Sequence, residues 1–323
     1  LCPTQLQRVQ VMIISILMLC IGLAILLTAA HFIIPGTISV ANHFRIPPHV
    51  IAVLLIAAGT SAPELIVAIQ AALYGSPQIV WGNIIGSNIT NILVVLSIAG
   101  LFFPISTLDN SSRRDMYVLL VVTAVIALSA YVFQSLPLAF SVILIVILAS
   151  YTLYLVRQQL NDDEVADNTE ESVSLKRSVI YCIGGVVGLV LGADLIVKGS
   201  VDLALALSIS KTVIGLTIVA FGTSLPEIAA AIASLIHKRT DMALGSIIGS
   251  NIFNITAGLG ITRLFSELPL TSEILTIGLP IMLLSTLILA GLIILKQAIA
   301  KLVSSCFLII YIIFLGLNMG FFS

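Results

Sequence analysis

The sequence has few charged residues. Asp, Glu, Lys and Arg together make up 9% of its 323 positions, whereas hydrophobic residues make up 59%. Soluble domains average about 25% charged and about 45–50% apolar residues, so this composition excludes a water-soluble globule. The net charge is only −1 and no Lys/Arg block occurs, which argues against a nucleic-acid partner, because such binding needs a basic face.

Cysteine and histidine are also scarce. The four cysteines form no CxxC or other metal-binding spacing, and we interpret them as packing residues. The four histidines have no ligand spacing either and lie near the ends of apolar runs. A zinc or copper site is therefore not expected, and nothing in the sequence indicates a bound cofactor.

What the chain does contain is a series of apolar runs of about 20 residues, each long enough to cross a hydrocarbon core about 30 Å thick. We therefore predict an all-α integral membrane protein that is embedded in the lipid bilayer through ten transmembrane helices. The first run lacks the cleavage site of a signal peptide, so we expect it to be retained. The predicted spans are 11–34, 49–73, 79–103, 116–134, 136–156, 178–198, 212–236, 242–264, 274–295 and 302–320.

One polar segment, residues 157–177, separates the fifth span from the sixth. It holds six of the fifteen acids and no aromatic residue, which is typical of a solvated linker. The predicted organisation is thus a five-helix half at 1–156, an acidic linker at 157–177 and a second five-helix half at 178–323. No signal of oligomeric state is present.

The two halves share an internal duplication. Residues 57–92 and 220–255 align without a gap, and 17 of the 36 positions are identical. Since each half has an odd number of spans, the second must enter the membrane from the opposite side. This is the inverted-repeat plan of secondary transporters, whose substrate sites lie near the bilayer midplane where the repeats meet.

Orientation follows from the Lys/Arg count. Ten of these residues lie on the odd-numbered connections and four on the opposite face. The positive-inside rule then places the acidic linker in the cytoplasm and both termini outside, in a multi-pass protein of the plasma membrane, here expected to be a bacterial inner membrane.

Two carboxylates fall near the middle of predicted spans, Glu64 in GTSAPE (59–64) and Glu227 in GTSLPE (222–227). A carboxylate at a span centre costs at least about 2.5–3.5 kcal/mol, so its default interpretation is functional, as an ion ligand or proton relay. Pro63 and Pro226 should weaken each helix and free backbone carbonyls, which are tolerated at this depth only when buried in protein or lining a cavity.

Further oxygen atoms accompany each Glu. On the same helical face, one turn earlier, stand hydroxyls of Thr60 and Ser61 in the first half and of Thr223 and Ser224 in the second. The following span of each half repeats GSN-I-x-N, where the Ser and the second Asn are four apart and share a face: Ser87 with Asn91, and Ser250 with Asn254. Asn88 and Asn251 should point elsewhere and bond helix to helix, and Gly86 and Gly249 should permit close helix approach.

Two carboxylates, two amide carbonyls, hydroxyls and freed backbone oxygens form a ligand set for a hard cation. Calcium takes 6 to 8 oxygen ligands in flexible geometry, whereas zinc or copper asks for nitrogen or sulfur. The residues thus indicate inorganic cations as the partners.

At these motifs the sequence resembles the cation/calcium exchanger superfamily, most closely its prokaryotic sodium/calcium exchanger branch. GTSxPE and GSNI-x-N, each present twice, carry the resemblance, and GADLIVKGS (192–200) is similar to the family's sixth span. The resemblance implies a ten-helix antiporter that moves calcium against sodium or protons. It implies Glu64 and Glu227 as central ligands, surrounded by Thr60, Ser61, Thr223, Ser224, Ser87, Asn91 and Ser250, with the carbonyls of Ala57 and Ala220 serving sodium sites.

One position departs from the family pattern, because Asn254 stands where well-studied members often carry Asp. The site then has two ionisable groups. A charge of −2 is neutralised by one calcium, two sodium ions or two protons, but three sodium ions leave it positive, which puts three-for-one exchange in doubt. Burial and a nearby like charge favour the neutral acid, so protons can serve as counter-ions.

The sequence therefore predicts a secondary antiporter that exchanges calcium for sodium or protons by alternating access, and not an enzyme. Three alternatives stay open: a monovalent cation/proton antiporter, a passive cation channel, and a membrane hydrolase using Ser61 or Ser224. The hydrolase is disfavoured, because no His or Lys stands at matching depth to activate a serine.

Overall fold

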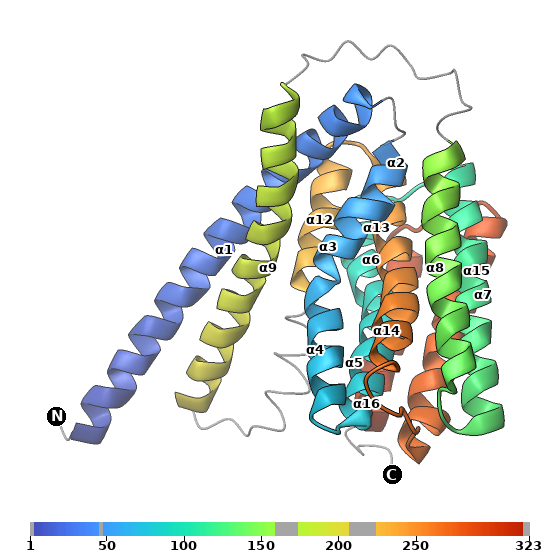
Figure 1. Cartoon of the computed structure of the whole chain (residues 1–323). Helices are drawn as coiled ribbons and strands as arrows, with labels where there is room; N and C mark the ends of the chain where they lie inside the picture. Colours follow the sequence, from blue (N-terminus) through green and yellow to red (C-terminus); the bar gives the residue numbers. More distant parts are fainter. Residues whose placement is uncertain (1–2, 45–47, 159–173, 207–223, 319–323) are drawn as a thin grey trace.

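The protein is helical, as predicted. Its computed structural model describes residues 3–44, 48–158, 174–206 and 224–318 (Figure 1). Within these ranges the only β-type pairings are two isolated bridges, Ile105 with Ile299 and Ser135 with Pro269. Helices are the expected solution for a chain in lipid, because they satisfy every backbone hydrogen bond within one segment.

Seven helices of the described ranges are long and apolar enough to cross a membrane, and the number becomes eight when one bent pair is counted as a span. Four of them are largely regular: α1 (Pro3–His43), α7 (Asn110–Phe133), α8 (Leu138–Gln158) and α9 (Leu175–Ala206). The π-helix η5 (Ile274–Gly278) precedes α15 (Leu279–Ile294) in a fifth. A multi-pass membrane protein is thus confirmed.

The spans that carry the repeated motifs are composite. One runs from α5 (Pro77–Thr90) through the π-helix η2 (Asn91–Val95) into α6 (Leu96–Phe102). Another runs from α13 (Thr240–Phe253) through the π-helix η4 (Asn254–Leu259) into α14 (Gly260–Thr262). The bent pair joins α2 (Pro48–Ile51), η1 (Ala52–Ala57) and α3 (Ala58–Thr60) to α4 (Ala62–Leu73). Two shorter apolar helices, α12 (Leu225–Ile236) and α16 (Lys301–Asn318), complete the described elements.

Most described helices coincide with the predicted spans, but three are longer than predicted: α7 begins at Asn110 instead of 116, α9 ends at Ala206 instead of 198, and α1 extends well beyond the predicted 11–34. Helix α1 continues through Pro35 to His43, so the predicted end before this proline was wrong. Proline is tolerated inside a membrane helix when neighbouring helices compensate for it, and here Gly36 lies directly against Ser178 and Tyr181 of α9. Of the predicted seventh span, 212–236, residues up to 223 lie outside the described ranges.

Helices α1 and α9 form a tilted pair beside the main bundle (Figure 1). They run antiparallel, because Gly22 lies against Gly192 near the middle of α9, while Gly199 near its end lies against Ser15. A Cβ added to Gly22 would lie 2.8 Å from the Gly192 carbonyl oxygen. The pair thus packs backbone against backbone, the usual use of small residues between membrane helices.

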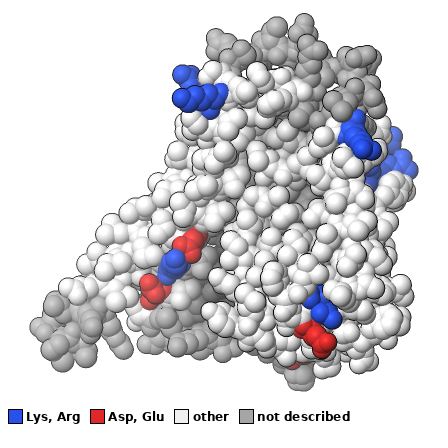
Figure 2. All heavy atoms as spheres, viewed as in Figure 1, with Lys and Arg blue, Asp and Glu red and all other residues white. Residues whose placement is uncertain are grey.

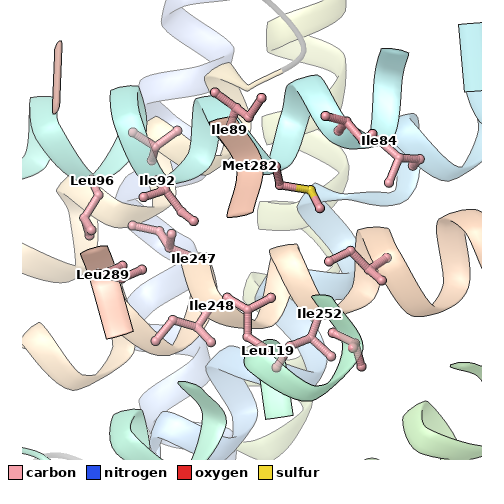
Figure 3. Close-up of a cluster of buried hydrophobic side chains, with 14 of the residues drawn as sticks. Ile84, Ile89, Ile92, Leu96, Leu119, Ile247, Ile248, Ile252, Met282 and Leu289 are labelled. Atoms are coloured by element: carbon pink, nitrogen blue, oxygen red, sulfur yellow. The ribbon is translucent and has the colours of Figure 1, made fainter. Parts of the chain in front are cut away.

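The centre of the bundle is built from the two composite spans. Their most apolar windows are 83% and 89% buried, against 17% for α1. Figure 3 shows Ile84 and Ile89 of α5 facing the same cluster as Ile248 and Ile252 of α13, with Leu119 of α7 beside them. Both copies of the GSN-I-x-N motif are therefore held in the best-packed part of the molecule.

The face of the molecule seen in Figure 2 is largely uncharged over its described residues. On the face of α9, Asp194 and Lys198, four residues apart, form an ion pair with Nζ 2.6 Å from Oδ2. Both side chains are about half exposed, 48% and 61%, so this pair contributes little to stability. A surface of this kind is typical of a protein surrounded by lipid.

Gly249 should be intolerant of any side chain. A Cβ there would lie 2.9 Å from the Ala57 Cβ and 3.2 Å from the Val53 Cα, so α13 and η1 would have to separate. We expect Gly249→Ala to lower the apparent melting temperature in detergent, because overpacking costs about 1–3 kcal/mol.

Gly82→Ala is the matched control, since an added Cβ at this helical position meets no described atom within 4 Å. Both substitutions gain the same helix propensity, so the difference between them isolates the clash. Equal melting temperatures for the two variants would show that α13 and η1 can move apart without loss of stability.

Candidate functional site

Each of the two membrane-embedded glutamates stands at the start of a half-helix. In the first half, α3 ends at Thr60, Ser61 adopts a turn, and α4 begins at Ala62 with a bend of 48°. Pro63 occupies the first turn of α4, where its missing N–H costs nothing, and Glu64 follows it. The predicted weakening of the helix by proline is confirmed as an actual break.

The second half has the same local structure in its described part. Helix α12 begins at Leu225, with Pro226 and Glu227 in its first turn and Ser224 immediately before it. The unpaired N–H groups at a helix start carry partial positive charge, which favours a carboxylate there. The PE dipeptide therefore stands in the first turn of a helix in both halves, where the helix start partly compensates the charge of the Glu.

Both carboxylates are buried, with exposed fractions of 1% for Glu64 and 3% for Glu227. Ser61, three residues before Glu64, donates a hydrogen bond to Glu227, which places the two acids on facing segments. The Oε2 atom of each has no hydrogen-bond partner among the described residues. Two like charges with unused oxygen atoms in a dry interior are strongly unfavourable unless a cation or protons neutralise them.

Hydroxyl groups connect the two halves around this carboxylate pair. Ser61 donates a hydrogen bond from Oγ to Oε1 of Glu227, at 3.3 Å, across the boundary between the halves. The hydroxyls of Thr60 and Ser250 lie 3.4 Å apart, and Ser250 also reaches the Ala57 carbonyl oxygen at 3.4 Å. The predicted approach of the two motif sets is thus seen in the structure.

The two asparagines proposed as ligands stand where their helices change from α-helical to π-helical geometry. Asn91 and Asn254 are each 1% exposed and each begins a π-helical segment, η2 and η4. π-helical turns inside α-helices occur frequently at functional sites. The Oδ1 atom of Asn91 and both polar side-chain atoms of Asn254 lack hydrogen-bond partners in the described part of the chain.

Sequence reasoning missed one residue of this cluster. Asn251 bonds helix to helix as expected, but it does not point away from the site, because its Oδ1 accepts a hydrogen bond from Asn91 Nδ2 at 3.0 Å. Asn88, in contrast, bonds its own helix, from Nδ2 to the Ile84 carbonyl at 2.8 Å. Asn251 lies in the regular part of α13, before η4 begins, and α13 packs against α5 and η2 of the other half. The helical spacing gave the face of Asn251 on its own helix but not the segment that this face meets.

Ten of the twelve residues proposed from the sequence are described, and all ten are buried. The largest exposed fraction among them is 7%, at Ser87. The remaining two, Thr223 and Ala220, lie outside the described ranges. In the described part of the chain no group of three or more His, Cys, Asp or Glu side chains gathers. The ten are Ala57, Thr60, Ser61, Glu64, Ser87, Asn91, Ser224, Glu227, Ser250 and Asn254.

The family profile described as "Sodium/calcium exchanger protein" matches residues 14–157 and again 177–320. Among curated relatives, the "Putative antiporter CaxA" of Alkalimonas amylolytica is 35% identical over 265 residues, which cover 77% of this chain and 80% of the relative. The "Sodium/calcium exchanger MaX1" of Methanosarcina acetivorans is 27% identical over 315 residues, covering 85% of this chain and 90% of the relative.

Solved structures give the same result. The sodium-calcium exchanger NCX_Mj, soaked with sodium and strontium, superposes with a TM-score of 0.82 and 31% sequence identity, covering 94% of this chain and 98% of that structure. The fold and the family profile are those of a membrane transporter of the cation/calcium antiporter class. The chain belongs to the sodium/calcium exchanger family, within the cation/calcium exchanger superfamily.

Removing one of the two buried charges should stabilise the protein in the absence of cations. We expect Glu64→Gln to raise the apparent melting temperature in detergent with a chelator present, because it relieves both charge repulsion and the desolvation of a carboxylate, which costs several kcal/mol. Glu267→Gln, at an exposed position, should leave it unchanged. A lower melting temperature for Glu64→Gln would mean that protein donors already satisfy the ionised carboxylate.

Proposed function

We propose that this protein exchanges calcium for sodium or protons at one site that both halves build. The observation that carries the proposal is the pair Glu64 and Glu227, buried together at two half-helix starts with an unpartnered oxygen atom on each. Such an oxygen-only set suits a hard cation such as calcium. The proposed ligands are Glu64, Glu227, Asn91, Asn254, Thr60, Ser61, Thr223, Ser224, Ser87, Ser250 and the carbonyls of Ala57 and Ala220.

The proposal includes ten spans arranged as two inverted halves, 1–156 and 178–323, joined by the linker 157–177. Contacts between α1 and α9 support it, because they occur in pairs related by the repeat offset of 163 residues. Gly22 contacts Ile196, and Gly185 contacts Ile33, which is the same contact with the halves exchanged. Pairs of contacts that are related by exchanging the halves are expected around a two-fold axis. The antiparallel course of α1 and α9 fits an axis in the membrane plane.

The two isolated bridges also support the inverted arrangement. Adding 164 to Ile105 and Ser135 gives the positions of Pro269 and Ile299, so the two bridges are images of each other. Each joins a connection of the first half to a connection of the second. The family profile likewise matches twice, once in each half, and leaves residues 158–176 out.

Exchange follows from the charge of the site. An empty site of charge −2 is costly to move through an apolar barrier, whereas a site neutralised by one calcium or by two monovalent cations can change its accessible side. Transport in one direction then requires transport in the other. The break at Ser61 and the helix start at Leu225 are where access can alternate.

For orientation, we propose that the linker is cytoplasmic and both termini are outside, in a bacterial plasma membrane. Figure 1 shows α8 ending and α9 beginning at the same end of the bundle, opposite the start of α1. The excess of Lys and Arg on that side favours a cytoplasmic location.

The proposal predicts calcium uptake into proteoliposomes of the purified protein when an outward sodium or proton gradient is imposed. Radioactive calcium measures the uptake, and each gradient is tested separately to identify the counter-ion. Glu64→Gln should abolish uptake, because the central charge is lost, while Glu267→Gln should transport normally.

The outcome also separates the alternatives. Calcium entry without any counter-gradient would indicate a channel. If neither gradient drives calcium uptake but sodium or potassium drives proton release, the substrate is a monovalent cation and not calcium.

The charge count further predicts electroneutral exchange. One calcium replaces two monovalent cations, so a membrane potential set with potassium and valinomycin should not change the calcium accumulation ratio. Asn254→Asp gives a site of charge −3, which three monovalent cations neutralise, and exchange should then respond to voltage. A potential of 100 mV on one net charge is worth about 2.3 kcal/mol, or about fifty-fold in accumulation. A voltage response in the unmodified protein would contradict the two-for-one count.

A further inference from the structure

A second pair of asparagines lies beside the proposed ligands. Asn251, on α13, is 1% exposed and bonds two residues of the first half. Its Oδ1 accepts from Asn91 Nδ2 at 3.0 Å, and its Nδ2 donates to the Asn88 backbone carbonyl at 3.4 Å. We infer that Asn251 is a positioning residue that fixes the Asn91 amide with its oxygen toward the cation, an inference that rests on the proposed function.

The direction of this chain of hydrogen bonds is set by its last acceptor. A backbone carbonyl can only accept, so the amide group that faces the Asn88 carbonyl must be the NH₂ of Asn251. Asn251 then presents Oδ1 to Asn91, so Asn91 must donate a hydrogen bond from its own NH₂ group. The Asn91 Oδ1 is thereby turned to the other side, where it is buried and lacks a partner among the described atoms.

The carbonyl that anchors this chain lies at a helix irregularity. The N–H of Asn91, at the junction between α5 and η2, is shared between the carbonyls of Ser87 and Asn88. The regular ladder of backbone bonds changes here from α to π spacing, and a carbonyl oxygen has two lone pairs. The Asn88 oxygen can therefore accept a second bond, from a side chain of the opposite half.

The duplication provides an internal comparison, because the equivalent chain is not formed in the other half. There, Asn88 takes the place of Asn251 and Asn254 takes the place of Asn91. Asn88 instead donates to the Ile84 carbonyl of its own helix, and its Oδ1 has no partner in the described part of the structure. Both polar atoms of Asn254 are likewise without one. The orienting contact is thus specific to Asn91.

An amide held in its binding orientation loses little rotational freedom when the ion arrives. Hydrogen-bond partners of metal ligands typically contribute 10–100-fold in metal affinity. We therefore expect Asn251→Ala to raise the KM for calcium by about ten-fold, with kcat little changed, in the proteoliposome exchange assay. Asn88→Ala is the matched control from the duplicated position and should change the KM less than about two-fold, because it orients no ligand.

A double-mutant cycle shows whether Asn251 acts through Asn91. Calcium titrations of the detergent-solubilised protein give the affinities of Asn251→Ala, Asn91→Ala and the double variant, so the readout does not depend on transport. We expect Asn251→Ala to cost nothing further once Asn91→Ala is present, because the oxygen that it orients is gone. A general structural defect would instead add to the loss.

Additive losses of calcium affinity in the double variant, or an unchanged calcium affinity in Asn251→Ala, would overturn the inference. The proposed function would still stand in that case, provided that the unmodified protein binds calcium. If the unmodified protein does not bind calcium, the proposed function fails first. If the alanine variant does not give monodisperse protein, Asn251→Leu replaces it. Leucine has a similar volume but cannot form hydrogen bonds, so we expect the same loss of calcium affinity.

Discussion

Two carboxylates buried together within a membrane protein are the constraint on which this structure depends. Glu64 and Glu227 are both nearly inaccessible, and each keeps an oxygen atom without a partner in the described part of the chain. Water cannot solvate them there, so the protein must supply positive potential and a cation or protons must supply the rest. The helix breaks place N–H groups beside each acid, and the surrounding hydroxyls and amides are the groups that a hard cation accepts.

The packing around the site follows from the same constraint. Helix breaks and π-helical turns weaken the spans that contain them, and these spans are held in the most buried part of the bundle. The close contact of Gly249 with Ala57 brings α13 onto η1, which sets the Ser250 hydroxyl against the Ala57 carbonyl. The α1 and α9 pair packs against the segments that carry the carboxylates (Figure 1). Val186 of α9 lies directly against Gly59 of α3, and Leu26 of α1 belongs to the same buried cluster as Ala229 of α12.

The sequence was sufficient to predict the features that repeat. Hydropathy located the described helices, although α1 and α9 extend well beyond their predicted ends, and the duplicated PE and GSN motifs identified buried carboxylates and amides. Features that depend on how neighbouring helices pack could not be predicted in this way. The length of α1 depends on how Gly36 packs against α9, and the contact between Asn251 and Asn91 depends on how α13 lies against the other half. Sequence spacing specifies which residues share a face of one helix, but not which neighbour that face meets.

The remaining property of the site is its asymmetry, and it has a physical basis. A two-fold arrangement would give each half the same contacts, yet Ser61 bonds Glu227 while the Ser224 hydroxyl has no partner among described residues. The Asn91 amide is likewise held, whereas that of Asn254 is not. Each hydrogen bond therefore fixes a polar group of one half by a partner from the other half, and its counterpart in the repeat is left without such a partner. Two repeats of similar sequence thus contribute unequally to the buried polar cluster.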